Sequence, residues 1–235
     1  MLISVEELVR AWSIKPSGVI HIGAHAAEES REYMRFGWGP VIWVEANPQL
    51  IERIRENIPD EDLVLCAALW DESGQLIDLN VASNGHSSSL LRPALHLKEY
   101  PEILFNSQIK VHSQRLDSIL TQIPNFLNID VQGAELHILR GMGQLIDSLD
   151  YIYTEVNEKE LYVGCVKLSD LEKFLKINGF RRVCLRRFGK SGWGDALYVR
   201  KTIEAPLSLR ITARTFVFYL KLQIGELIRL LKNRL

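Results

Sequence analysis

The chain has 235 residues, of which 47% are hydrophobic, and its formal net charge is −1. This length and composition predict one globular domain with a substantial core and at most a small appendage. The sequence shows no Cys-x-x-Cys pair, no Cys/His cluster and no signal peptide, which argues against a zinc site of those kinds and favours reduced cysteines in the cytoplasm.

Helical and strand patterns alternate along the chain as far as about residue 200. Helices are marked by capping residues and closing glycines, and strands by short apolar or alternating runs. Alternation of this kind, ending in a hairpin, predicts a mostly parallel sheet with one antiparallel strand and helices around it. The expected elements are a helix after Ser4, strand 18–23, helix 28–36, strand 41–45, helix 48–57, strands 63–69, 76–82 and 109–113, helix 116–122, strand 126–130, helix 134–149, strand 151–156, a helix over 170–178 opened by a capping box at Ser169, and strands 180–187 and 196–200.

The first strand and the turn after it indicate a nucleoside-containing cofactor. The apolar strand runs into a turn at Gly23, and the next strand ends at Glu45, 22 positions later. A glycine lets a ligand approach the backbone, and a carboxylate at this position accepts hydrogen bonds from ribose hydroxyls. The turn lacks the further glycines of G-x-G-x-x-G, so a pyrophosphate cradle is disfavoured. S-adenosylmethionine, which carries no phosphate, fits better.

Three later strands also end in small or acidic residues. Ala67 follows the third strand, Asp130 ends the strand at 126–130, and Glu155 lies near the end of 151–156. Ligands of open α/β sheets bind beyond the carboxyl ends of the strands, so these residues are expected to share one rim with Gly23 and Glu45. The glycine- and serine-rich segment 84–89 resembles the loops that often cover a ligand.

Four segments together resemble one protein family. Phe126–Gly141, with the sequence FLNIDVQGAELHILRG, is similar to the signature of the FkbM-like methyltransferases. The segments HIGAH at 21–25, EANP at 45–48 and WGDALY at 193–198 agree with it in order and spacing, and the match covers about residues 17–200. The resemblance implies an S-adenosylmethionine-dependent enzyme with the class I (Rossmann-like) methyltransferase fold, whose mostly parallel sheet has seven strands and an antiparallel terminal strand.

The resemblance also assigns roles to residues of the site. It places the methionine part of the cofactor near Gly23–His25, the ribose on Glu45, the adenine beside Ala67, and Asp130 near the point of methyl transfer. The predicted cofactor contacts are Gly23, Ala24, His25, Glu28, Glu45, Ala46, Asn47, Ala67 and Asp130.

Three positions depart from the family pattern. His21 stands where many relatives have aspartate, Ala27 stands where they often have glycine, and Asn128 replaces a frequent lysine. An alanine tolerates such a turn only with a negative φ, which predicts a wider loop or weaker cofactor binding.

Transfer of a methyl group to a hydroxyl requires positioning and the removal of a proton. The candidate catalytic bases are Asp130, Glu155 and His86. Alternatively, Asp130, Glu155 and Asn157 could hold a divalent cation such as Mg²⁺ that acidifies the hydroxyl. From the family resemblance and these carboxylates we expect O-methylation of a sugar, glycan or similar polyol.

The end of the chain differs from the rest in charge. Residues 201–235 contain seven basic residues against two glutamates, so residues 1–200 carry a net charge of −6. An acidic body argues against nucleic acid as a partner. We expect a methyltransferase domain over 1–200 and a basic amphipathic helical tail over 201–235. Residues 207–235 contain no apolar run long enough to span a bilayer; they are expected to pack on the body, on a second subunit, or at an anionic membrane surface.

Two other functions remain compatible with the turn at Gly23 and the acid at Glu45. One is an NAD-dependent oxidoreductase, because the same strand-turn-helix unit and ribose acid suit that cofactor. The other is a non-catalytic module that binds an adenosine cofactor or a partner.

Overall fold

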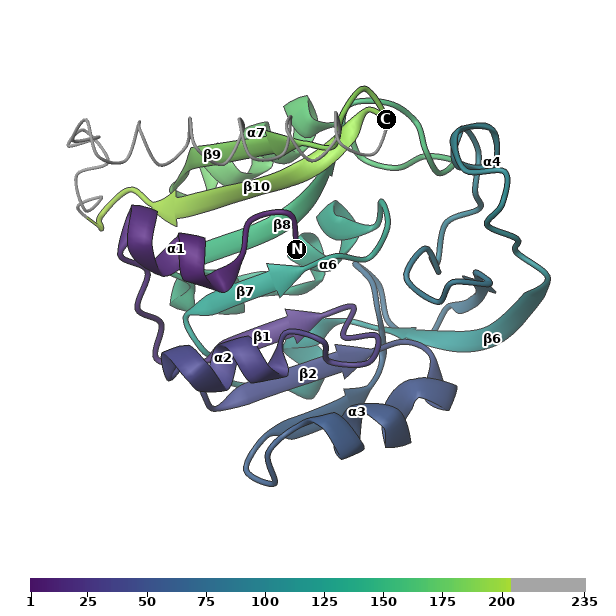
Figure 1. Ribbon diagram of the computed structural model, residues 1–235. Helices are drawn as coiled ribbons and strands as arrows, with labels where there is room; N and C mark the ends of the chain where they lie inside the picture. The colour runs from purple at the N-terminus through teal and green to yellow at the C-terminus, as the bar shows by residue number, and fades with distance from the viewer. Residues whose placement is uncertain (204–235) are drawn as a thin grey trace, which may run out of the picture.

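The computed structural model describes residues 1–203, which form a seven-stranded sheet, a three-stranded sheet and the helices around them (Figure 1). The strand order of the large sheet is β3-β2-β1-β7-β8-β10-β9. Neighbouring strands are parallel except along β10, which is antiparallel to both β8 and β9. The strands of this sheet are Val19–Ile22 (β1), Val41–Glu45 (β2), Leu63–Cys66 (β3), Phe126–Ile129 (β7), Tyr151–Asn157 (β8), Phe180–Arg187 (β9) and Trp193–Arg200 (β10).

Helices cover both faces of the large sheet because side chains on its central strands alternate between two apolar cores. Val19 faces one core and Ile20 the other, and Phe126 and Leu127 divide in the same way. In Figure 1 the helices α1, α2 and α3 lie in front of the sheet, whereas α6 and α7 lie behind it. The helices are Val5–Trp12 (α1), Ser30–Phe36 (α2), the 3₁₀ turn Pro48–Leu50 and Ile51–Asn57 (α3), His96–Glu99 (α4), Leu116–Ile119 (α5), Glu135–Gly141 (α6), the 3₁₀ segment Gly143–Ser148 and Leu168–Ile177 (α7).

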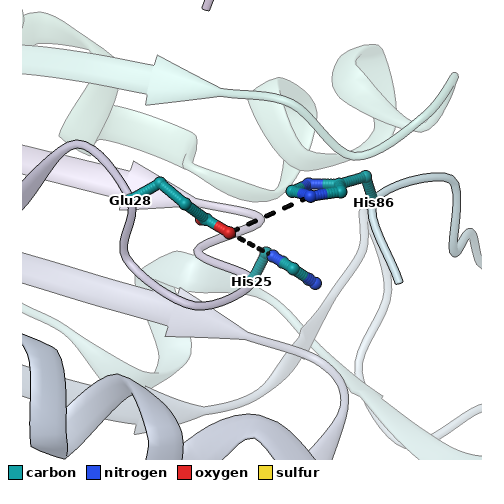
Figure 2. A group of neighbouring side chains, drawn as sticks. All are labelled: His25, Glu28 and His86. Atoms are coloured by element: carbon teal, nitrogen blue, oxygen red, sulfur yellow. Dashed lines mark hydrogen bonds and ion pairs between the residues drawn. The ribbon is translucent and has the colours of Figure 1, made fainter. Parts of the chain in front are cut away.

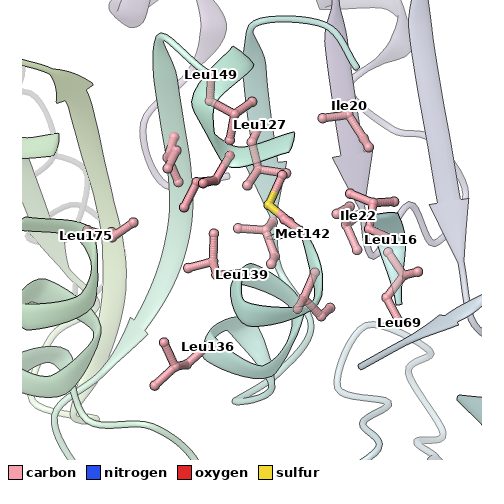
Figure 3. Close-up of a cluster of buried hydrophobic side chains, with 14 of the residues drawn as sticks. Ile20, Ile22, Leu69, Leu116, Leu127, Leu136, Leu139, Met142, Leu149 and Leu175 are labelled. Atoms are coloured by element: carbon pink, nitrogen blue, oxygen red, sulfur yellow. The ribbon is translucent and has the colours of Figure 1, made fainter. Parts of the chain in front are cut away.

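The core behind the sheet is built mainly from leucine and isoleucine. Figure 3 shows Leu139 and Met142, from α6 and the turn after it, beside Leu127 of the sheet, and Leu136 and Ile20 belong to the same buried cluster. All five side chains are buried. Burial of a side chain of this size contributes about 1.5–3 kcal/mol, so this core holds β1 and β7 side by side. The carboxyl ends of those two strands carry the predicted site.

The expected α/β architecture is confirmed, and the three cysteines are free thiols. One predicted strand is wrong, however. The segment 63–69 divides into β3 in the large sheet and Ala68–Leu69 (β4) in the small one. The small sheet has the order β4-β6-β5, with β5 at Leu76–Val81 and β6 at Ser107–Gln114. At Ala67 the backbone N–H donates to the Glu45 carbonyl, after which the chain leaves β2 and pairs with β6.

Several helices begin or end at other residues than expected; α2 begins at Ser30 and α5 ends at Ile119, and two larger differences have a clear cause. The helix predicted over 134–149 is α-helical only to Gly141, because Gly143 has a φ of +52° and the chain continues as a 3₁₀ helix. The capping box at Ser169 is not used. A β-bridge to Asn157 holds Lys167 in an extended conformation, so α7 begins one residue after it, at Leu168.

The amphipathic tail predicted over 201–235 lies almost entirely outside the described residues, which end at 203. Its helix and its contacts with a membrane or a second subunit therefore stay predictions. Within residues 1–203, every helix is too short or too polar to cross a membrane.

Candidate active site

A cavity of about 370 Å³ opens at the carboxyl ends of β1, β2, β7 and β8. The turn at Gly23, the Glu45 carboxylate and the acids Asp130 and Glu155 lie at the ends of these strands and line the cavity. The segment 84–90 also lines it. Carboxyl ends of parallel strands are where open α/β sheets bind ligands. The rim predicted from the strand ends therefore exists as one continuous cavity. The predicted residues that line it are Gly23, His25, Glu45, Ala46, Ala67, His86, Asp130 and Glu155.

Gly23 allows two backbones to meet at this rim. Its φ is +86°, and its N–H donates to the Val44 carbonyl of β2 at 2.9 Å. A Cβ atom at this position would overlap the carbonyl oxygen of Asp130 at the end of β7. Because glycine has no Cβ, the ends of β1 and β7 can touch, and the cavity floor is formed where they do.

The turn after Gly23 is tighter than expected. Both His25 (φ +47°) and Ala27 (φ +57°) have left-handed backbone conformations. The expectation of a negative φ at Ala27 is therefore wrong. The turn keeps its shape because the Ala27 N–H donates to the Ala24 carbonyl at 2.7 Å and the methyl group of Ala27 is buried in the core beside α2. A left-handed alanine costs roughly 1–2 kcal/mol, which this packing offsets.

Glu45 is anchored by the backbone around it. One carboxylate oxygen accepts the N–H of His25 at 2.9 Å, and the other accepts the N–H of Asn47 at 2.8 Å. Burial raises the pKa of Glu45 above its ordinary value, and the hydrogen bonds from these two donors offset only part of that shift. Each oxygen has a further lone pair, so the carboxylate can accept hydrogen bonds from a ligand in the cavity.

Two other predicted cofactor residues, Ala24 and Asn47, stabilise the turns beside the cavity. Ala24 is buried, and its N–H donates to the Val44 carbonyl at 3.1 Å. The Asn47 side chain is buried and accepts the N–H of Gln49 at 3.0 Å, which caps the 3₁₀ turn at Pro48. Their side chains do not line the cavity.

His25, Glu28 and His86 lie together at the mouth of the cavity (Figure 2). His25 Nδ1 is 2.6 Å from Glu28 Oε1, and His86 Nε2 is 3.9 Å from the same oxygen. Burial raises the pKa of Glu28, but the hydrogen bond from His25 and the charges of both histidines lower it to about 2. The carboxylate is therefore ionised at neutral pH, and His25 Nδ1 is the donor. The rings of His25 and His86 are also in contact, with centroids 3.9 Å apart, so the loop 84–89 packs against the turn that follows Gly23.

Asp130 and Glu155 are joined by one amide. Gln132 Nε2 donates to Asp130 Oδ1 at 2.7 Å and to Glu155 Oε2 at 2.8 Å, and Gln132 has a left-handed φ of +56°. The Tyr162 hydroxyl donates to the side-chain oxygen Oε1 of Gln132 at 2.9 Å, and this hydrogen bond fixes the orientation of the side-chain amide. Both carboxylates therefore accept from the same NH₂ group.

The two carboxylates differ in exposure and in pKa. Asp130 is open to the cavity but is surrounded by the protein that forms the cavity walls, whereas Glu155 is only 4% exposed. Burial and the Asp195 carboxylate raise the pKa of Asp130 to about 6. Burial, followed by the charges of Asp130 and Glu135, holds the pKa of Glu155 well above its ordinary value. At neutral pH Asp130 is the ionised member that faces the cavity.

Comparison with known proteins agrees with this geometry. The model of the methyltransferase FkbM domain matches residues 21–182, which is more than half of the chain. The chain belongs to the FkbM methyltransferase family. It is also 30% identical over 170 residues to the 2-O-methyltransferase NoeI of Sinorhizobium fredii, a match that covers 66% of this chain and 69% of that protein. The family resemblance seen in the sequence is therefore confirmed, and the protein is an S-adenosylmethionine-dependent methyltransferase.

Solved structures of other methyltransferases are similar to this FkbM-family chain at low identity. Methyltransferase FkbM of Methylobacillus flagellatus is 14% identical, with a TM-score of 0.49 over 77% of this chain and 43% of that one. Magnesium protoporphyrin IX methyltransferase of Synechocystis, solved with bound S-adenosylmethionine, is 11% identical, with a TM-score of 0.45 over 77% and 69% of the two chains.

Two departures from the FkbM pattern turn out to be neighbours. His21 on β1 pairs in register with Asn128 on β7. Asn128 Nδ2 donates to the Tyr33 hydroxyl at 2.8 Å, and that hydroxyl lies 3.3 Å from His21 Nδ1. Burial lowers the pKa of His21, so the histidine is neutral. Many relatives have an aspartate and a lysine at these two positions. In this chain His21 and Asn128 are both uncharged and hydrogen-bonded, so no unpaired charge is buried here. Both residues face α2 and do not line the cavity.

The residues predicted for a divalent cation are only partly arranged for one. The Asn157 side chain is buried, and its amide lies 3.3 Å from Glu155 Oε1. The Gln132 amide, however, donates to Asp130 and Glu155 in the place where a cation would bind between them. Within residues 1–203, the group of three His, Cys, Asp or Glu donors that lie close enough for a metal ion is His25, Glu28 and His86.

Some residues that line the cavity were not predicted as site residues. Gln132 lies inside the FkbM signature, which was a usable signal. His96, Tyr100 and Phe188 also line the cavity. They lie in segments whose sequence carries no motif, so their positions depend on how distant parts of the chain pack together.

Proposed function

We propose that this FkbM-family protein methylates a hydroxyl group of a saccharide or similar polyol. The observation that carries the proposal is Asp130, an ionisable carboxylate at the cavity whose pKa is raised to about 6. A base with such a pKa is ionised at neutral pH and still basic enough to accept a proton from a hydroxyl as it reacts. The 2-O-methyltransferase named among the relatives supports the choice of oxygen as the atom that is methylated.

The cofactor half of the cavity fits S-adenosylmethionine. Glu45 presents a carboxylate to the ribose hydroxyls, the backbone at Gly23 permits close approach, and Ala46 and Ala67 offer a narrow apolar wall for the adenine. The bound cofactor supplies an activated methyl group, which passes to the acceptor oxygen and leaves S-adenosylhomocysteine.

The protein's own residues position the acceptor and handle its proton. Asp130 accepts the hydroxyl proton, and Gln132 holds the Asp130 carboxylate in place through the hydrogen bond to Oδ1. The pKa of Glu155 is held well above its ordinary value, which disfavours a second negative charge beside Asp130. His86 covers the mouth of the cavity together with His25 and Glu28. We therefore assign catalysis to Asp130, with Glu155 and His86 as positioning residues.

Replacing Glu45 by glutamine is expected to weaken binding of S-adenosylhomocysteine by about 10–100-fold, because one charge-assisted hydrogen bond to the ribose is lost. Isothermal titration calorimetry of the full chain measures this change. Glu52→Gln, at an exposed position on α3, is the matched control and is expected to bind as the unmodified protein does. Binding of NAD without binding of S-adenosylhomocysteine would contradict the cofactor assignment.

Exhaustive chelation is expected to leave methyl transfer unchanged, since the Gln132 amide takes the place of a cation between Asp130 and Glu155. The measurement is transfer of a radiolabelled methyl group to acceptors in a cell extract, before and after treatment with EDTA. Loss of activity that Mg²⁺ restores would instead support the cation on Asp130, Glu155 and Asn157.

A further inference from the structure

The side of the cavity away from the cofactor turn is built from three segments distant in sequence. Leu161 and Tyr162 form a small buried cluster, against which Leu95, Phe105 and Trp193 pack. The segment around α4 is attached to it by backbone hydrogen bonds from the N–H groups of Ala94 (2.8 Å) and His96 (3.1 Å) to the Leu161 carbonyl. This wall is therefore a packed structure and not a loose loop.

His96 is an unusual member of this wall. It lines the cavity and is 4% exposed, yet its Nδ1 has no hydrogen-bond partner within residues 1–203. Its ring is surrounded by Tyr100, Phe105 and Tyr162, at centroid distances of 5.0, 5.4 and 5.3 Å. A buried ring nitrogen without a partner is unfavourable. Nδ1 has almost no accessible surface in this structure, so a ligand hydroxyl reaches it only after a small movement of the ring, and that hydroxyl would then be stabilised.

An aromatic pair lies on the same side. Phe188 and Trp193 are stacked, with centroids 4.7 Å apart and an angle of 22° between the ring planes. Trp193 is held in place because its Nε1 donates to the Tyr100 hydroxyl at 2.9 Å. Phe188 lines the cavity but remains 47% exposed. The pair thus presents a rigid apolar surface that the core does not require.

We propose that this wall is the acceptor subsite and binds a pyranose ring, with an apolar C–H face of the sugar on Phe188 and Trp193 and a ring hydroxyl on His96. This inference rests on the proposed function and names the part of the cavity that would recognise the acceptor. A pyranose has both an apolar face and a polar edge, and the wall offers a surface for each. C–H groups carry a small positive charge and are attracted to the negative face of an aromatic ring.

The charges nearby agree with an uncharged polar ligand. Burial lowers the pKa of His96, so the ring is neutral at pH 7 and can either donate to or accept from a hydroxyl. Ser87 and Ser88 of the adjoining loop, which are polar but uncharged, also line the cavity. A flat phenolic acceptor would also stack on Phe188, but it would bring one hydroxyl and no further polar edge for these groups.

Saturation-transfer NMR and titration test the subsite, with full-length protein in the presence and absence of S-adenosylhomocysteine. The probes are a panel of methyl hexopyranosides and methyl 6-deoxyhexopyranosides, with phenol and catechol as the aromatic alternatives. Phe188→Ala removes the exposed ring, and Ile177→Ala, at an 84% exposed position on α7, is its matched control. His96→Phe keeps the aromatic packing without the ring nitrogen, and His96→Asn restores a polar atom near the position of Nδ1.

We expect at least one pyranoside to bind. Phe188→Ala and His96→Phe should each weaken it about tenfold, His96→Asn should recover part of the loss, and Ile177→Ala should have no effect. Affinity for S-adenosylhomocysteine should stay the same in all four variants. Binding of the phenols alone, of no probe, or of pyranosides equally in Phe188→Ala and His96→Phe would overturn the subsite. The variants could weaken pyranoside binding as expected although the unmodified protein does not bind S-adenosylhomocysteine. That result would support the subsite and contradict the proposed function.

Discussion

Replacing Asp130 by asparagine is expected to lower kcat by about 10²–10⁴-fold and to leave the affinity for S-adenosylhomocysteine unchanged within a few-fold. The asparagine carbonyl oxygen can still accept the hydrogen bond that Gln132 Nε2 makes to Asp130, so the local structure is retained. What is lost is the capacity to take a proton from the acceptor. The measurement is the initial rate of methyl transfer under saturating cofactor, with titration calorimetry on the same samples.

Glu155→Gln is the matched variant for Asp130→Asn. The raised pKa of Glu155 favours its protonated form, which glutamine resembles, so the rate should fall far less than in Asp130→Asn. An equal or greater loss in Glu155→Gln would transfer the role of base to Glu155. Full turnover in Asp130→Asn would remove Asp130 from the mechanism altogether.

The pH dependence of the unmodified enzyme follows from the same group. A general base must be deprotonated, and burial together with the charge of Asp195 raises the pKa of Asp130 to about 6. The value of kcat/KM should therefore rise with pH through about 6 and level off above it. Asp130→Asn should lack this step in the profile. A rise centred near the ordinary carboxyl value of about 4 would contradict the assignment.

Gly23→Ala is expected to destabilise the fold by at least about 3 kcal/mol and to abolish cofactor binding in the molecules that remain folded. The left-handed φ alone accounts for about 1–2 kcal/mol. The added Cβ would also overlap the carbonyl oxygen of Asp130, so β1 and β7 would have to separate at the cavity floor. Urea unfolding of the full chain measures the first effect and calorimetry with S-adenosylhomocysteine the second.

Gly74→Ala separates the two causes. Gly74 has the same φ of +86°, but a Cβ there meets no atom within 4 Å. We expect this control to lose about 1–2 kcal/mol and to bind the cofactor normally. Equal stability losses in the two variants would show that the contact between Gly23 and Asp130 is unimportant.

Much of the fold could be predicted because its signals are local. The capping box at Ser4, the glycine that ends α2 at Gly37 and the apolar run of β1 each lie within a few residues and mark the element they belong to. Two of the predictions that were wrong depended on distant contacts. The strand over 63–69 divides at Ala67 because β6, more than forty residues later, pairs with its second half. The helix α7 begins only at Leu168 because the bridge to Asn157 holds Lys167 in an extended conformation.

The sequence by itself determined which strand ends meet at the cavity. Gly23, Glu45 and Asp130 follow three neighbouring parallel strands, and parallel strands bring their carboxyl ends to one edge whatever else the chain does. Family motifs cover the same residues. The positions that depart from the family pattern were harder to interpret from the sequence. Ala27 adopts the left-handed conformation, and His21 is paired with Asn128 away from the cavity.

The tertiary structure decided everything that depends on burial or on contacts between distant segments. Asp130 and Glu155 look equivalent in the sequence, but their different surroundings raise the pKa of Asp130 to about 6 and hold the pKa of Glu155 well above its ordinary value. The acceptor wall joins His96, Phe188 and Trp193, which no local pattern connects. A pKa and a binding surface are properties of what surrounds a residue in space, and the order of residues along the chain specifies those surroundings only through the complete fold.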